Sequence, residues 1–266
     1  MISHWPGLSL PERAWRVVRR WALAWWRILY LGAVVLVLVL SPSSYVRGTR
    51  RALARHLYLD TAPVLIGFTV LAALISLVLT RIVVVTALSY GLSRYALEMV
   101  IRVLVLELIP LTAALFVAMR CTIPNGTQLA LLRQSGHLAR LSNAGADPIR
   151  VELLPRAVAG VFACITLAAL SCVVALVLAY LGVYGFSLAG LPSYTRMFGH
   201  VFAPAVTLVF VIKTGLFSLA VALIPMAAGL YDTGERTQPD SELGGLARMF
   251  AVLLLIEIGS LVGNYY

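Results

Sequence analysis

Long runs of apolar residues, separated by shorter polar segments, recur along most of this 266-residue chain. Five of the runs are long enough to cross about 30 Å of hydrocarbon as α-helices, which rise about 1.5 Å per residue. These predicted spans cover residues 61–88, 98–119, 157–184, 202–229 and 246–265. The pattern therefore predicts an all-α polytopic membrane domain over residues 57–266. Residues 1–56 are predicted to form an amphipathic interfacial or re-entrant segment, followed by a basic connector that contains Arg47, Arg50, Arg51 and Arg55.

The N-terminal segment has a two-sided pattern. Ser9, Pro11 and Glu12 have the spacing of a helix start, with Ser9 as the N-cap. On the helix that follows, arginines and apolar residues fall on opposite faces: Arg13, Arg16, Arg20 and Arg27 against Trp15, Ala22, Trp25, Trp26 and Leu29. Such faces are typical of a helix that lies in the membrane interface. The alternative is that residues 21–40 cross the bilayer. The basic region is too long for a signal peptide, so we expect the segment to be retained.

Composition agrees with a membrane protein, because 61% of the residues are hydrophobic and only 12% are charged. The formal net charge is +10, but 20 of the 21 basic residues are arginines placed mainly between apolar runs. This distribution is typical of a topology signal rather than of nucleic-acid binding. With five spans and a cytoplasmic N-terminus, sixteen arginines lie on the cytoplasmic side and four outside. The positive-inside rule therefore predicts that the C-terminus lies outside the cytoplasm.

The longest cytoplasmic segment, residues 120–156, is predicted to contain a helix at about 128–144. Two heptad pairs would lie on opposite sides of this helix, one apolar and one basic: Leu131 with Leu138, and Arg133 with Arg140. The sequence Gly145-Ala146-Asp147-Pro148 then ends the helix. A short amphipathic helix between two spans can dock into a partner protein or lie on anionic lipid, and the residues favour neither alternative.

A set of short motifs occurs in a fixed order along the chain. The main ones are Glu107-Leu108-Ile109-Pro110, Arg120, Arg133, Gly145-Ala146-Asp147-Pro148, Pro155-Arg156 and Ala159-Gly160. Three others are His56-Leu57-Tyr58, Ile212-Lys213-Thr214 and Tyr231-Asp232. In this order, and with this hydropathy, the motifs resemble those of the MlaE/YrbE permease family. The similarity covers about residues 50–266.

The resemblance implies the permease subunit of an Mla-type ABC transporter, which moves phospholipid or related lipid between the bacterial inner membrane and the periplasm or outer membrane. It implies a permease dimer, a separate ATPase that binds ATP and Mg, a periplasmic MCE-domain protein and often a STAS-domain subunit. Residues 128–147 would form the coupling helix that meets the ATPase, with Leu131, Arg133, Leu138, Arg140 and Asp147 as its main residues. The permease chain itself would carry no cofactor and no enzymatic activity.

The coupling segment departs from the family pattern. Gln128, Gly136, Ala139 and Ser142 stand where the family usually has acidic residues, so the helix becomes basic. This departure is compatible with a divergent ATPase partner or with one half of a heterodimeric permease. It is also compatible with a permease-like scaffold or regulator that no longer couples to ATP. A different transporter or a membrane enzyme is a further alternative.

Three ionisable residues lie within the predicted spans, where a charge is costly and points to function. Glu107, beside Pro110, corresponds to the family glutamate near the lipid pocket. It would contact a lipid headgroup, or form a salt bridge that holds helices together. Lys213 would contact a lipid phosphate, or pair with Glu107 or Glu257. Glu257 is interpreted as structural.

Small residues predict close helix packing at two places: Ser171, Ala175 and Ala179 at a four-residue spacing, and Gly259 with Gly263. Each is interpreted as a contact within the chain or as a dimer face. The three cysteines are interpreted as apolar fillers, and the four histidines are too scattered for a metal site. The sequence has no G-x-x-x-x-G-K-[ST] motif and no clear nucleophile–base pair, so we expect neither a metal site nor catalysis.

Overall fold

The computed structural model describes residues 10–41, 47–91, 93–231 and 240–265, which form helices and short turns without any β-strand. Five helices are long: α1 (Leu10–Leu40), α2 (Arg47–Ser89), α7 (Leu154–Tyr184), α9 (Pro204–Tyr231) and α10 (Asp240–Tyr265). A sixth long stretch comprises α3 (Ser93–Val100), η2 (Ile101–Leu108), α4 (Ile109–Val117), η3 (Ala118–Thr122) and α5 (Ile123–Gln134). All six contain a segment long and apolar enough to cross a membrane. The predicted all-α polytopic fold is confirmed.

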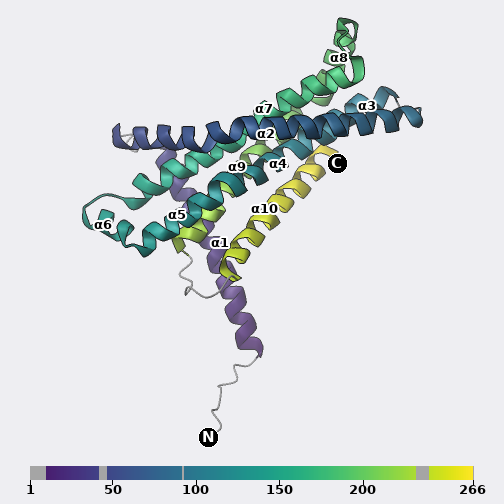
Figure 1. Cartoon of the computed structure of the whole chain (residues 1–266). Coiled ribbons are helices and arrows are strands. Elements are labelled where there is room, and N and C mark those ends of the chain that lie inside the picture. The colour runs from purple at the N-terminus through teal and green to yellow at the C-terminus, as the bar shows by residue number, and fades with distance from the viewer. Residues whose placement is uncertain (1–9, 42–46, 92, 232–239, 266) are drawn as a thin grey trace.

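Most of these helices form one bundle (Figure 1). α2, α7, α9 and the α3–α5 stretch run side by side, and α10 packs against α9 at a slant. The short α6 (His137–Asn143) lies at one end of the bundle, here called the α6 end. The opposite end, called the α8 end, carries α3, α8 (Leu191–Val201) and the C-terminus. The interior is apolar and well packed, which is what holds helices together in lipid; it includes Phe68, Val117, Leu167, Phe217 and Leu253.

α1 crosses the bundle at the α6 end and does not run along it (Figure 1). Its buried side chains, Leu31, Val35 and Leu38, pack against residues that all lie near that end: Leu129, Leu153, Leu154, Ala157, Met226 and Ala227. A helix that followed α9 across the membrane would also meet α9 side chains nearer the α8 end. The interfacial position of this helix stays a prediction, and Trp21–Leu40 has the length and hydropathy of a sixth membrane span.

Only part of the predicted two-sided pattern of α1 falls on described side chains. Ser9 lies outside the described residues, and so do the side chains of Arg13, Trp15, Arg16 and Arg20. Trp21 and Trp26 are exposed, as expected of tryptophans at a membrane interface. Trp25 is half-buried and meets Trp21 edge to face, with ring centroids 5.7 Å apart.

The structure corrects two predicted element boundaries. The basic connector before the first predicted span is helical, because α2 begins at Arg47. The predicted single helix at 128–144 is wrong: α5 ends at Gln134, and α6 begins at His137 after a turn. Gly136 in this turn has a φ of 73°, a conformation that residues with a Cβ rarely adopt. The two heptad pairs are therefore divided between two helices and do not share faces.

α5 and α9 cross in close contact at two glycines. A Cβ atom at Gly126 would lie 2.6 Å from the carbonyl oxygen of Pro225, and a Cβ at Gly229 would clash with the carbonyl oxygen of Gly126. The obstructing atoms belong to the backbone, so neither clash can be relieved by a change of rotamer. This crossing joins the start of α5 to the C-terminal part of α9.

We expect Gly229→Ala to lower the free energy of unfolding by about 1–3 kcal/mol, because the added methyl group forces two helices apart. Gly259→Ala is the matched control, since a Cβ there meets no atom within 4 Å. Thermal unfolding of the purified chain in detergent would measure both. Equal effects of the two substitutions would contradict the close crossing.

Candidate functional site

A buried cluster of charged groups joins η2, α9 and α10 near the α8 end. Lys213 on α9, with a side chain only 1% exposed, forms an ion pair with Glu107 on η2. It also pairs with Glu257 on α10, whose Oε2 lies 2.9 Å from Nζ but off the axis of a hydrogen bond. Asn264 Nδ2 donates to Glu107 Oε1 at 3.3 Å. The cluster thus ties together three helices that are distant in sequence.

Pro110 provides the Lys213 cluster with a backbone acceptor. A proline has no N–H, so the carbonyl four residues earlier, that of Leu106, lacks the donor that an α-helix would supply. Lys213 Nζ donates to this Leu106 oxygen at 3.3 Å. The structure therefore brings together all three residues predicted for the lipid site, Glu107, Pro110 and Lys213.

The geometry shows Lys213 as a group that pairs helices. Its Nζ is surrounded by the two glutamates, the Leu106 carbonyl and the ring of Phe217, whose centroid lies 5.7 Å away. Both Glu107 carboxylate oxygens also have partners. Lys213 was expected either to contact a lipid phosphate or to pair with Glu107 or Glu257, and in the structure it pairs with both glutamates. A phosphate would reach Nζ only after these pairs separate.

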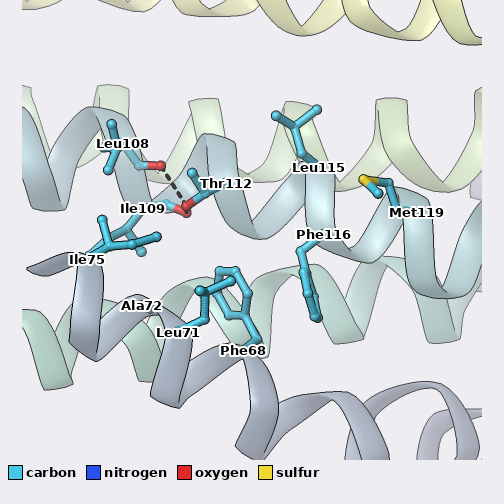
Figure 2. Close-up of a pocket in the computed structure, with 10 residues that line it drawn as sticks. All are labelled: Phe68, Leu71, Ala72, Ile75, Leu108, Ile109, Thr112, Leu115, Phe116 and Met119. Carbon is cyan, nitrogen blue, oxygen red and sulfur yellow. Dashed lines mark hydrogen bonds between the residues drawn. The ribbon is translucent and has the colours of Figure 1, made fainter.

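An apolar groove runs between α2 and the second membrane stretch (Figure 2). Its cavity has a volume of about 190 Å³. Phe68, Leu71, Ala72 and Ile75 line it from α2, and Leu108, Ile109, Thr112, Leu115, Phe116 and Met119 line it from the opposite wall. The one polar side chain among them, Thr112, donates to the Leu108 carbonyl at 2.9 Å, so its hydroxyl hydrogen is already bound. Leu108, the first lining residue of this wall, directly follows Glu107 in the chain.

Two arginines close the C-terminal end of α9 at the α6 end. Arg133 Nη1 on α5 donates to the Leu230 carbonyl at 2.7 Å, and Arg27 Nη1 on α1 donates to the Tyr231 carbonyl at 3.4 Å. Carbonyls in the last turn lack partners within their own helix, and a cation there also complements the helix dipole. The Arg133 side chain therefore joins α5 to the end of α9 and does not contribute to an exposed basic face.

The other predicted coupling residues occupy different environments. Leu131 is 63% exposed on α5, whereas Leu138 on α6 is half-buried against the side chains that pack with α1. Arg140 is exposed. Asp147 Oδ1 accepts a hydrogen bond from the Ile149 amide at 3.0 Å, which fixes the turn before η4 (Ile149–Leu153). The exposed surface of this segment is thus mostly small and polar, with one apolar and one basic side chain.

A polar network at the α6 end was not predicted. Asp60 Oδ2 on α2 accepts from Asn125 Nδ2 on α5 at 2.9 Å. Glu152 on η4 pairs with Arg156 on α7 at 2.5 Å and with His137 on α6 at 3.5 Å. Asn125 is 6% exposed and lies in a stretch that is otherwise mostly apolar. This isolated amide in the sequence could have indicated a buried polar contact. The network links α6 and α5 to the membrane helices.

The two predicted packing patterns differ in the structure. Ser171, Ala175 and Ala179 are fully buried, and the two alanines belong to the apolar interior between η2, α7 and α8. Gly259 faces open space, and a Cβ at Gly263 would only touch Val209 at 3.7 Å. The first pattern is therefore a contact within the chain, whereas the second is not a close one. All three cysteines are buried.

Residues 53–259 match the family described as Permease MlaE. The match covers most of the chain, from the first part of α2 into α10. The chain belongs to the MlaE permease family. A comparison with curated proteins gives no match. This MlaE permease is a multi-pass membrane protein and a permease subunit of an ABC-type transporter, which works with a partner ATPase.

We expect Lys213→Met in this MlaE permease to lower the free energy of unfolding by about 3–5 kcal/mol, because it leaves two buried carboxyls without their cation. A triple variant that also carries Glu107→Gln and Glu257→Gln should recover most of this loss. Denaturant unfolding in detergent would compare them. A triple variant as unstable as the single one would show that the charges are not balanced against one another.

We expect Arg133→Gln to cost about 1–2 kcal/mol, because the last turn of α9 loses a cation and a hydrogen-bond donor. Arg140→Gln, on an exposed side chain, should change stability by no more than about 0.5 kcal/mol. Hydrogen exchange should rise at the end of α9 only in the first variant. Faster exchange there in both variants would contradict the assignment.

Proposed function

We propose that this MlaE permease moves a phospholipid or a related lipid between the bacterial inner membrane and the periplasm or outer membrane. The observation that carries the proposal is the apolar groove between α2 and α4 (Figure 2). Its volume of about 190 Å³ exceeds the roughly 150 Å³ of an apolar cavity that holds a benzene molecule. An acyl chain has the chemistry that such a lining accepts.

The groove is accessible from the surroundings of the bundle. Leu71 and Met119, which line it, are 44% and 72% exposed. A lipid tail can therefore enter from the side, without passing through the packed interior. Glu107 precedes the groove residues Leu108 and Ile109 in the chain, which supports placing the lipid headgroup near the Lys213 cluster.

The proposed assembly has its partners at opposite ends of the bundle. α5 and α6 would meet the ATPase in the cytoplasm, with Leu131 and Arg140 as exposed contacts and Arg133 as a residue that positions α5. The α8 end and the C-terminus would face the periplasm and an MCE-domain protein. Opposite placement of α6 and the C-terminus (Figure 1) and the sixteen-to-four arginine distribution support this orientation.

The remaining parts of the proposal come from the family. A second permease copy, identical or from a related chain, would complete the lipid-binding unit, and a STAS-domain subunit would accompany the ATPase. ATP and Mg would bind the ATPase chain. The small polar surface of α5 and α6 supports a partner with a shallow complementary groove that receives Leu131.

We expect Leu71→Trp to reduce transfer of a labelled phospholipid by about tenfold, because the larger side chain occupies groove volume that an acyl chain would fill, and tenfold corresponds to about 1.4 kcal/mol of lost binding free energy. Leu74→Trp is the matched control, since Leu74 is 59% exposed on the same helix and does not line the groove. Transfer would be measured between vesicles with the permease and its ATPase co-purified from native membranes.

Equal transfer by the two tryptophan variants would show that lipid does not use the groove. A wild-type complex that hydrolyses ATP but transfers no lipid would contradict the proposed function. Recovery of the permease without any ATPase under mild detergent would favour the scaffold alternative.

A further inference from the structure

The Lys213 cluster contains one more acidic group than basic groups. Glu107 and Glu257 share the single ammonium of Lys213, so the cluster carries a net charge of −1 when all three groups are ionised. The described ion pair nearest to it in the chain joins Arg102 and Glu98 at 3.0 Å. The charge of Arg102 is therefore already balanced by Glu98. An uncompensated charge buried among membrane helices is strongly unfavourable, so one further positive charge is required.

The arrangement of the two carboxyls shows where a proton would sit. Glu107 and Glu257 both contact the same Lys213 Nζ, so their two carboxyl groups are neighbours around one ammonium group. An ionised carboxylate only accepts hydrogen bonds, so two carboxylates can bond to each other only when one of them holds a proton. When two carboxyl groups share one site, their mutual repulsion favours a state in which one of them holds a proton.

Two neighbouring polar atoms on α10 also lack a hydrogen-bond partner among the described residues. Ser260 is 6% exposed, and its Oγ has no hydrogen-bond partner among the described residues; the same is true of Asn264 Oδ1. Their spacing from Glu257, three and seven residues, places all three on the same side of α10. A proton on Glu257 adds a donor to this face, where Asn264 Oδ1 is an acceptor without a partner among the described residues.

We propose that Glu107 and Glu257 form a binding site for one proton, held between their carboxyl groups beside Lys213. Binding takes the cluster from a net charge of −1 to zero. Loss of the proton leaves two like charges in contact across η2 and α10, and these helices then repel each other at the α8 end. Proton occupancy therefore controls how tightly α10 packs against the second membrane stretch. The proposal does not depend on the identity of the transported molecule.

Infrared spectroscopy of the full-length permease in lipid nanodiscs tests the site directly. Glutamate labelled with ¹³C at its carboxyl carbon separates a protonated glutamic acid from lipid esters and aspartates. The wild type should show the C=O stretch of a protonated glutamic acid at neutral pH, shifted in D₂O and lost at high pH. Glu107→Gln and Glu257→Gln should each abolish the band, because the remaining carboxylate then balances Lys213 one to one.

Glu152→Gln is the matched control, since Glu152 pairs with Arg156 and His137 outside the cluster. The band should persist in this variant. A wild type without the band at neutral pH would overturn the proposal. So would a band that survives both Glu107→Gln and Glu257→Gln, or one that disappears in Glu152→Gln. If one cluster variant fails to fold, the wild type and the other variant still decide. A permease that shows the band but moves no lipid would refute the proposed function alone.

Discussion

Hydrocarbon offers no hydrogen-bond partners, so each polar group that this chain carries into the membrane must find its partner within the protein. Helices satisfy most of the backbone in this way. The exceptions decide how the helices are joined: the Leu106 carbonyl near Pro110 accepts from Lys213, and the carbonyls that end α9 accept from Arg133 and Arg27. Polar contacts thus join neighbouring helices at each end of the bundle. Close packing at Gly126 and Gly229 sets the distance between α5 and α9.

The two polar regions of the protein have different tasks. The Lys213 cluster has a fully buried lysine between two partly buried glutamates, and it joins η2, α9 and α10 at the α8 end. The network of Asp60, Asn125, Glu152, Arg156 and His137 lies at the α6 end and connects α6 with the membrane helices. Between them the groove is lined by apolar side chains and one satisfied hydroxyl. This separation places charge where helices are joined and leaves the groove compatible with an acyl chain.

Hydropathy and motif order predicted the membrane helices and the family, because both depend on residues close together in the sequence. The pairing of Lys213 with Glu107 or Glu257 was one of two alternatives, since a buried charge requires a partner but does not name it. The break at Gly136 was missed because the 3.6-residue period continues through it, and one positive φ leaves that period intact. The hydrogen bond from Arg133 to the end of α9 could not be predicted from the sequence, because its acceptor at Leu230 is 97 residues away. The groove depends on how α2 and α4 meet in space.

The continuity of the second membrane stretch has a mechanical consequence. From Ser93 to Gln134 the backbone is helical without interruption, so the outer end of α5 and the groove wall at Leu115 and Phe116 belong to one continuous helical segment. A displacement of the outer end of α5 would therefore be transmitted to that wall, and the close Gly126–Gly229 contact is the point about which the helix would tilt. The turn at Gly136 separates α6 from this helix, and α6 is instead joined to the membrane helices through His137 and Leu138, so a movement of α5 need not carry α6 with it.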